Sequence, residues 1–442
     1  MAGGLGGRRR GRGMMHLAWF VGRGYSVHGW QQDWWGEEFR DWTNPSIYIG
    51  LAQALDRARF DFLMIEDGSL IPDAYQGSHD AYLRHAVSAP KADPMPLVPL
   101  LGQATAGLGI IATMTTSFYP PYLGARLAAT LDHITGGRAG INLVTAHNDR
   151  AAQNFGLDRI YEHDKRYEIA SEWVEVADKL WRSWEPDAIR ADPASGVFAD
   201  GAKVHPIDHR GDYFKVRGPL NLPPGPQGRP VICQAGGSPA GKNFAARHAD
   251  TVIALVRTVA DAKRYRADMT ELLKQWGRPP TACKVMFCTS VLLADTKAEA
   301  EARRQRRKQA LASNLEPRLA ALSFFGQRDL SKVPLDEPLP RDQSNASRTM
   351  VDAYTAKAST LREVALDDEV TGIPFIGTAE SVAAEMADAM AEIGGDGFLI
   401  TEPLSRRTIA EITDGLVPAL QRRGAARRSY DRRTLRENLQ AF

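Results

Sequence analysis

The stretch TGGRAGINLVTAH at residues 135–147 joins a helix to a strand. The helical pattern before it ends at Gly136 and Gly137, and glycine readily adopts the positive φ angles with which helices stop. The following run, residues 138–144, is apolar apart from Asn142 and is bounded by turn residues, as buried strands are. In parallel α/β proteins, ligands bind at the carboxyl ends of the strands, so this junction predicts a site as well as a fold.

Seven more apolar runs of this kind lie along the chain, and helical patterns separate them. The eight candidate strands are residues 16–21, 60–65, 109–116, 138–144, 231–235, 251–256, 284–293 and 397–401. A strand followed by a helix, repeated eight times, is the pattern of a closed (β/α)8 barrel. We therefore predict an α/β fold, a TIM barrel with insertions.

Two segments do not fit this repeat. Residues 1–14 are rich in Gly and Arg, and we expect a disordered tail there. A segment from about residue 300 to 370 is too long for one connection, so we expect an insertion between the seventh and eighth strands, which could serve as a lid. A helical pattern over residues 297–321 begins it. We predict that residues 15–442 form a single domain.

Two connections have a distinctive composition. Residues 187–230 are rich in Pro and Gly, which favours extended loops, with a hairpin near Gly211. The loop after the first strand carries four tryptophans, which would suit a core plug and a substrate wall equally well. They are Trp30, Trp34, Trp35 and Trp42.

The bulk composition excludes several classes of protein. The 55 basic and 53 acidic residues leave a net charge of +2, which gives no reason to expect nucleic acid or an anionic membrane as a partner. No apolar run approaches the ~18 residues that span a bilayer. Cys233, Cys283 and Cys288 lie in or beside apolar runs, so we expect inert core thiols and a reducing, cytoplasmic setting.

The remaining chemical signals lie at predicted strand ends. The sequence has no GxSxG elbow, P-loop or GxGxxG, and we predict no metal site. Glu66 and Asp67 end the second strand. Gly236, Gly237 and Ser238 precede a helix whose backbone N–H groups could hold a phosphate, although a plain turn has the same sequence.

Six segments carry a family resemblance when they are taken together. They are residues 60–67, 117–122, 128–138, 152–156, 163–167 and 234–241. The chain resembles the bacterial-luciferase-like flavin monooxygenases, and within them the group of nitrilotriacetate and EDTA monooxygenases, pristinamycin IIA synthase and dibenzothiophene-sulfone monooxygenase. Residues 196–200, 203–205 and 217–220 look most like the sulfone-monooxygenase branch. The resemblance implies a TIM barrel of the luciferase-like type.

The resemblance also implies a two-component monooxygenase. A separate NAD(P)H-dependent flavin reductase would supply reduced FMN (FMNH2), which would react with O2 to a C4a-(hydro)peroxyflavin and oxygenate a small organic substrate. An apolar compound containing sulfur or nitrogen would suit the family, which also implies a homodimer or homotetramer. Three alternatives stay open: an F420-dependent oxidoreductase on the same barrel, a single-component flavoprotein that oxidises NADH, and a non-catalytic flavin-binding relative.

Nine residues would form the site by their positions in these motifs. Asp67 and Thr113 would lie near the flavin ring or ribityl chain, His163, Tyr167, Gly237 and Ser238 would hold the ribityl-phosphate end, and Asn142, Thr145 and His147 would face the isoalloxazine and the substrate. Asn142 and His147 would be the catalytic residues, with His147, or a histidine of residues 79–85, supplying a proton or a hydrogen bond. Plainer roles are open too: Asp67 could cap a turn, and Tyr167 could pack on its helix face.

The chain departs from the family pattern at three places. Glu66 adds a carboxylate beside Asp67, and Ala146 occupies a position where relatives tend to have a hydroxyl side chain. The tryptophan-rich loop is unlike the sequence that the family usually has there. Glu66 places an extra carboxylate near the expected site. Together the changes leave flavin binding as the expectation and the identity of the substrate open.

Overall fold

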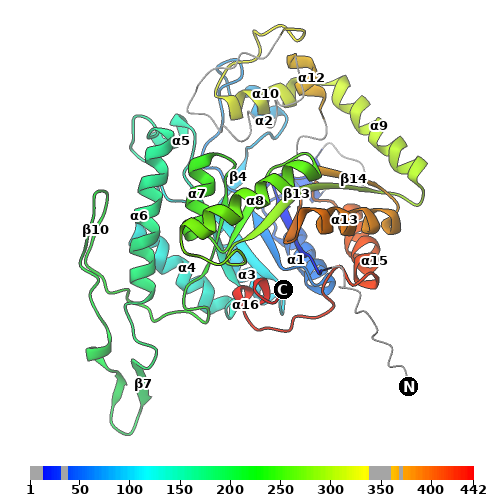
Figure 1. The fold of residues 1–442 in the computed structure, drawn as a ribbon. Helices are drawn as coiled ribbons and strands as arrows, with labels where there is room; N and C mark the ends of the chain where they lie inside the picture. The colour runs from blue at the N-terminus through cyan, green and yellow to red at the C-terminus, as the bar shows by residue number, and fades with distance from the viewer. Residues whose placement is uncertain (1–12, 31–37, 338–359, 368–371) are drawn as a thin grey trace, which may run out of the picture.

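Eight parallel strands form a closed barrel in the computed structural model, which describes residues 13–30, 38–337, 360–367 and 372–442 (Figure 1). The strands are β1 (His16–Val21), β3 (Phe62–Ile65), β5 (Gly109–Thr115), β6 (Ala139–Val144), β11 (Val231–Ala235), β12 (Thr251–Ala254), β13 (Lys284–Leu293) and β15 (Gly397–Ile400). Each strand pairs with the next one in chain order, and the pairing of β15 with β1 closes the ring. The predicted TIM barrel is confirmed. Only strand ends differ; β12, for example, ends at Ala254 rather than at residue 256.

The outer face of the barrel is covered by helices. They are α1 (Ser46–Ala58), α3 (Leu97–Gln103), α4 (Pro121–Thr135), α6 (His163–Trp181), α7 (Pro239–His248), α8 (Val259–Gln275), α13 (Ala379–Ile393) and the C-terminal series α14 (Arg406–Ala410), η3 (Glu411–Leu416) and α15 (Val417–Arg422). Helix α4 stops as predicted, because Gly136 and Gly137 adopt φ angles of 66° and 90°. The large apolar cluster lies between these helices and the sheet.

Alternation along the strands decides which side chains enter the barrel. Phe62 and Met64 of β3 belong to the interior cluster, whereas Leu63 and Ile65 pack against the helices. The same alternation in β5 and β6 turns every second residue inward, because Ile111 belongs to the interior cluster. Polar residues near the carboxyl ends of β5 and β6 therefore face the inside of the barrel.

The C-terminal segment closes the amino end of the barrel. Helix α16 (Leu435–Leu439) inserts Leu435 and Leu439 into the interior cluster, and the ring of Phe442 stacks on His16 at a centroid distance of 4.3 Å. The C-terminal segment therefore covers the amino end of the barrel interior.

The predicted insertion differs from expectation in its helices. The pattern over residues 297–321 is two helices, α9 (Lys297–Ser313) and α10 (Glu316–Gly326). Pro317 in the first turn of α10 lacks the N–H that one continuous helix would need, so the chain breaks before it. Strand β14 (Ile373–Gly377), which the sequence did not predict, pairs with the carboxyl half of β13 outside the barrel.

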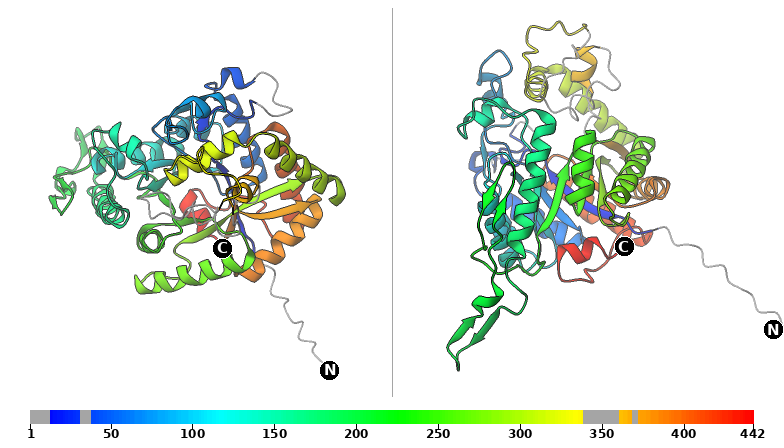
Figure 2. Two further views of the ribbon diagram at one scale, coloured as in Figure 1. Left: turned by 90° about the horizontal axis from the view of Figure 1, so that it is seen from above. Right: turned by 60° about the vertical axis from the view of Figure 1, so that its left-hand side comes forward.

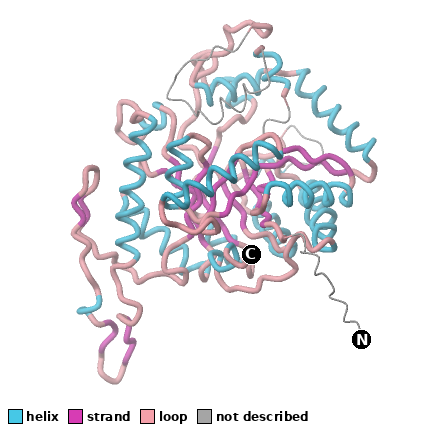
Figure 3. The backbone as a smooth tube through the Cα atoms, in the orientation of Figure 1, coloured by secondary structure: helices cyan, strands magenta, loops and turns pink. Residues whose placement is uncertain are grey.

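Short elements complete the fold. They are β2 (Tyr25–Ser26), η1 (Glu38–Asp41), α2 (Asp80–Arg84), β4 (Lys91–Ala92), α5 (Asp149–Gln153), β7 (Ile189–Asp192), β8 (Val197–Ala199), η2 (Gly201–Lys203), β9 (His209–Arg210), β10 (Lys215–Val216) and α12 (Leu361–Leu366). β9 and β10 form the hairpin predicted near Gly211. A second, unpredicted hairpin of β7 and β8 projects away from the barrel (Figure 3).

A second apolar cluster lies apart from the barrel core. Helix α2 packs there against α10 and α12, on the side of the barrel opposite α16 (Figures 1 and 2). The insertion thus rests on the connection that follows β3. Residues 1–12 of the expected tail, together with Trp34 and Trp35, lie outside the described residues, and the division into domains stays a prediction.

Candidate active site

Two predicted residues meet inside the barrel near the carboxyl ends of β5 and β6. Thr113 and Asn142 are direct partners in the strand register, and both are buried. Nδ2 of Asn142 donates to Oγ1 of Thr113 at 3.1 Å, and that hydroxyl donates to the carbonyl of Ile65 at 2.9 Å. Oδ1 of Asn142 has no hydrogen-bond partner within the described part of the chain. A buried, unpaired amide oxygen costs about 1–3 kcal/mol, so this atom is suited to accept from a ligand.

A second polar group surrounds Tyr167, in the layer between the strand ends and the helices. The Tyr167 hydroxyl lies within hydrogen-bonding reach of the side chains of Ser238, Gln234 and Thr145. Burial raises the pKa of Tyr167 despite these bonds, so the phenol remains protonated and can donate. The ring of His163 lies 5.3 Å from that of Tyr167, and its Nδ1 donates to Asp164 at 2.6 Å. The predicted pair on α6 is therefore brought together.

The glycine turn before α7 supplies a cradle of backbone groups. Ser238 caps α7, and its Oγ accepts from the N–H of Gly241 at 3.1 Å. Gly237 precedes it in the turn. A Cβ atom on Gly236 would lie 2.6 Å from Gln234, and one on Gly241 would lie 2.9 Å from the Tyr167 hydroxyl. Only glycine fits this close approach, and the positive end of α7 makes the cradle suitable for a phosphate.

Asp67 lies at the end of β3, next to the strand that carries Thr113. Burial, and next the charge of Glu66, raise the pKa of Asp67 to about 6. Glu66 itself forms an ion pair with Lys91. The extra carboxylate of this chain is thus paired with Lys91, and it still contributes to the raised pKa of Asp67.

His147 lies where the insertion meets the barrel. Its ring centroid is 5.5 Å from that of Phe324 and 6.5 Å from that of Phe325, both in α10. Its Nε2 is buried and has no hydrogen-bond partner among the described residues. Burial, and next the charge of Arg166, lower the pKa of His147 to about 4. The imidazole is therefore neutral near pH 7.

Three residues near the site were missed from the sequence. Gln234 is a buried amide within an otherwise apolar strand, and its Oε1 has no partner in the described part of the chain. A polar residue inside an apolar strand is a signal that could have identified it. Arg166 donates to the carbonyl of Ala146, and Gln327 donates to the carbonyl of His147. Sequence spacing gives no hint of these long-range contacts.

The histidines of the 79–85 segment are engaged elsewhere. His79 bonds through Nδ1 to the carbonyl of Pro72 at 2.8 Å, and His85 donates through Nε2 to Glu316 at 2.6 Å. His147, unlike these two, lies in the loop that directly follows β6.

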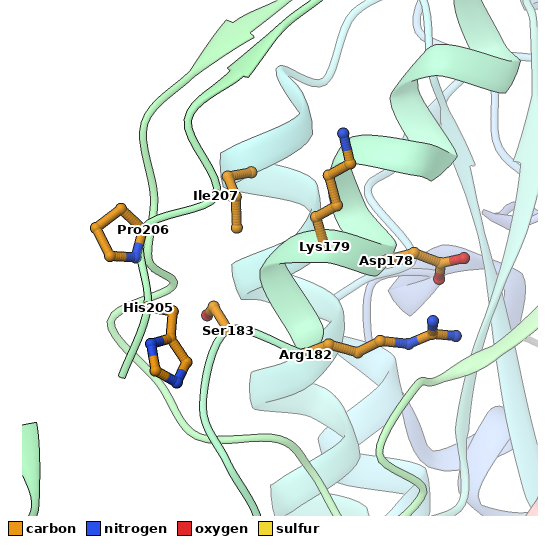
Figure 4. Close-up of a pocket in the computed structure, with 7 residues that line it drawn as sticks. All are labelled: Asp178, Lys179, Arg182, Ser183, His205, Pro206 and Ile207. Atoms are coloured by element: carbon orange, nitrogen blue, oxygen red, sulfur yellow. The ribbon is translucent and has the colours of Figure 1, made fainter. Parts of the chain in front are cut away.

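A pocket of about 310 Å³ lies away from these groups. It is lined by Asp178, Lys179, Arg182, Ser183, His205, Pro206 and Ile207. Figure 4 shows that Lys179, Arg182 and His205 point in different directions, so no set of donors converges on one ligand atom. It lies at the end of α6 opposite His163 and Tyr167.

The described residues were also compared with the requirements of metal and membrane sites. They contain no group of three or more His, Cys, Asp or Glu side chains placed to hold a metal ion. None of the helices within the described ranges could span a membrane. The three cysteines are buried, and burial raises the pKa of each thiol, as expected for inert core thiols.

Known proteins are similar to this chain in sequence and in fold. A family model described as luciferase-like monooxygenase matches residues 36–397. Dibenzothiophene-sulfone monooxygenase of Rhodococcus erythropolis (strain XP) is 35% identical, with 96% of both chains covered. Nitrilotriacetate monooxygenase component A of Aminobacter aminovorans is 37% identical, with 90% of both chains covered. The crystal structure of a long-chain alkane monooxygenase matches with a TM-score of 0.86 at 33% identity, covering 96% of this chain and 95% of that one. The chain belongs to the luciferase-like monooxygenase family, as its motifs predicted, and is an enzyme of that type.

Proposed function

We propose that this chain is the oxygenating component of a two-component, FMNH2-dependent monooxygenase. A separate NAD(P)H-dependent flavin reductase supplies reduced FMN, and one oxygen atom of O2 enters a small, apolar organic substrate that contains sulfur or nitrogen. The observation that carries the proposal is the unpaired, buried Oδ1 of Asn142 at the same end of the barrel as the glycine turn in which Ser238 caps α7. The relative from Aminobacter is named as component A of its monooxygenase, which supports a separate partner protein for this chain.

The two polar groups match the two ends of an FMN molecule. Ser238, Gly237 and the first turn of α7 bind the phosphate, with Tyr167 and His163 beside it. Thr113 and Asn142, inside the barrel, hydrogen-bond the polar edge of the ring. Thr145 connects both groups, because it follows β6 and reaches Tyr167.

Bound reduced FMN would supply the two electrons with which O2 is activated. The task of the protein is to position the reactants and to exclude water from them. Phe324 and Phe325 cover His147, and the second apolar cluster lies behind them. His147, neutral at pH 7, donates a hydrogen bond toward the reacting oxygen rather than a full proton. Asp67, with its raised pKa, is the group that can exchange a proton near pH 6.

A coupled assay tests the proposal. The full chain is combined with a flavin reductase, NADH, FMN and ¹⁸O2, and sulfones, thioethers and amines are screened for products that carry ¹⁸O. The expected result is reductase-dependent incorporation of one ¹⁸O atom into at least one compound. NADH oxidation by the chain without a reductase, or anaerobic turnover with F420, would contradict the proposal. We also propose that the protein is a cytoplasmic homodimer or homotetramer. Light scattering of the purified chain tests this oligomeric state.

A further inference from the structure

Helix α10 of the insertion forms one wall of the candidate site. Phe324 and Phe325 stand 5.2 Å apart, centroid to centroid, and both rings contact the ring of His147. The side chain of Gln327, directly after the helix, donates to the His147 carbonyl. The insertion is therefore docked on the loop that follows β6, and its aromatic side chains face that loop.

The chemistry of this wall is apolar and aromatic. Phe324 is 8% exposed and belongs to the second apolar cluster with Leu319 and Leu322, and Phe325 packs against the same cluster. Aromatic faces attract planar rings in stacked or edge-on arrangements, and they also favour contact with sulfur atoms. The two phenyl rings themselves carry no charge, and the charge that acts on His147 from nearby is that of Arg166.

The wall is also held in place by contacts between α10 and α2. Glu316, its first residue, accepts from Nε2 of His85 at 2.6 Å and from Arg84 at 3.1 Å. The Tyr82 hydroxyl donates to the carbonyl of Ala320 at 3.0 Å. Both ends of α10 are thus fixed, one on α2 and the other on the loop of His147. The side chain of Glu316 bonds to Arg84 and His85, so any effect on substrate would act through the position of α10.

We propose that Phe324 and Phe325 are specificity-determining residues that select a planar, apolar, ring-bearing substrate, and that Glu316 is a positioning residue that holds them over His147. The inference deepens the proposed function and rests on it, because it takes the surroundings of His147 as the substrate side of the site.

Equilibrium binding tests the wall without requiring turnover. Dibenzothiophene sulfone and nitrilotriacetate are titrated by calorimetry into the full chain saturated with FMN. We expect dibenzothiophene sulfone to bind more tightly than nitrilotriacetate. The substitution Phe325→Leu keeps apolar volume but removes the ring, so it should weaken sulfone binding about tenfold. Phe324→Ala should act in the same direction. Phe198→Ala is the matched control, because Phe198 is 70% exposed on the β7–β8 hairpin. Tighter binding of nitrilotriacetate, or equal sulfone affinity in Phe325→Leu, would overturn the proposal.

Hydrogen exchange tests the positioning role. Glu316→Ala should speed exchange in residues 316–326 about tenfold or more and weaken sulfone binding, while FMN affinity stays unchanged. Glu301→Ala, on the exposed face of α9, should change neither quantity. Unchanged protection of α10 in Glu316→Ala would overturn the assigned role. Failure of the proposed function is distinguishable, because the sulfone would then bind through the wall without ¹⁸O incorporation.

Discussion

At the amino end of the barrel, Asp61 meets His16 at 2.9 Å and Arg427 at 2.6 Å, and all three side chains are buried. At the carboxyl end, by contrast, Asn142, His147 and Gln234 each keep a buried polar atom without a partner in the described part of the chain. The amino end of the barrel thus holds a network of ion pairs and hydrogen bonds, whereas the carboxyl end holds buried polar atoms without partners among the described residues.

The contrast separates stability from function. Burial alone would raise the pKa of Asp61, but the charge and hydrogen bond of His16 and the charge of Arg427 lower it, so the carboxylate is stabilised as an ion. Nε2 of His16 also lacks a partner, but that ring stacks on Phe442 and is sealed by the C-terminal segment. The C-terminal segment does not cover the unpaired groups at the carboxyl end, and a ligand could satisfy them there.

Breaking the amino-end network should have the largest effect on stability. Asp61→Ala leaves the buried charge of Arg427 without its carboxylate, and removing one partner of a buried pair costs about 3–5 kcal/mol. Chemical denaturation measures the loss, and Glu301→Gln on the surface is the control. A loss below about 1 kcal/mol, the range of exposed ion pairs, would show that the two ends do not differ in this way.

At the carboxyl end, Asn142→Leu should preserve stability and reduce turnover. It removes a buried amide with an unsatisfied oxygen, so the free energy of unfolding should stay equal or rise. Turnover per bound flavin should fall roughly 10²-fold, the usual cost of removing one positioned polar group. Denaturation and the coupled assay are run on the same preparation. Lower stability with normal turnover would identify Asn142 as a structural residue of the barrel.

Glycine substitutions sharpen the comparison within the carboxyl end. Gly241→Ala brings a Cβ to 2.9 Å from the Tyr167 hydroxyl, so reduced FMN should bind at least about tenfold more weakly. Gly50→Ala is the matched control, since it lies in α1 with no atom within 4 Å of the new Cβ. Both changes favour a helix, so any common effect on folding cancels. Anaerobic titration with reduced FMN gives the affinities, and equal values would place the phosphate elsewhere.

A further expected effect is a dependence of stability on pH that arises from His147. Its pKa is lowered from 6.5 to about 4, so the unfolded chain binds more protons than the folded one between these values. Stability should therefore decline as the pH falls from 6.5 toward 4, and His147→Gln should show a shallower decline. Unfolding free energies at pH 7 and pH 4.5 measure the difference. Equal slopes for both proteins would mean that the imidazole titrates normally.

Sequence reasoning predicted the eight barrel strands well and the insertion poorly. Thr113 and Asn142 were proposed from their positions in the family motifs, and the strand register makes them neighbours. Tyr167 and Ser238 came from motif resemblance, and the structure brings them within hydrogen-bonding reach. Their roles toward FMN stay predictions.

The contact of His147 with α10 could not be predicted in the same way. About 180 residues separate His147 from Gln327. The apolar periodicity predicted one helix across residues 297–321, whereas the structure has a break before Pro317. Long-range docking of this kind depends on the packing of α2 against α10, which no local pattern encodes.

The most direct test of the account is a crystal structure of the full chain with FMN bound. We expect the phosphate at Ser238 and the first turn of α7, and a polar edge of the isoalloxazine within hydrogen-bond distance of Oδ1 of Asn142. A flavin bound at the amino end of the barrel or in the pocket beside Arg182, or an Oδ1 of Asn142 that stays unpaired in the complex, would contradict the account.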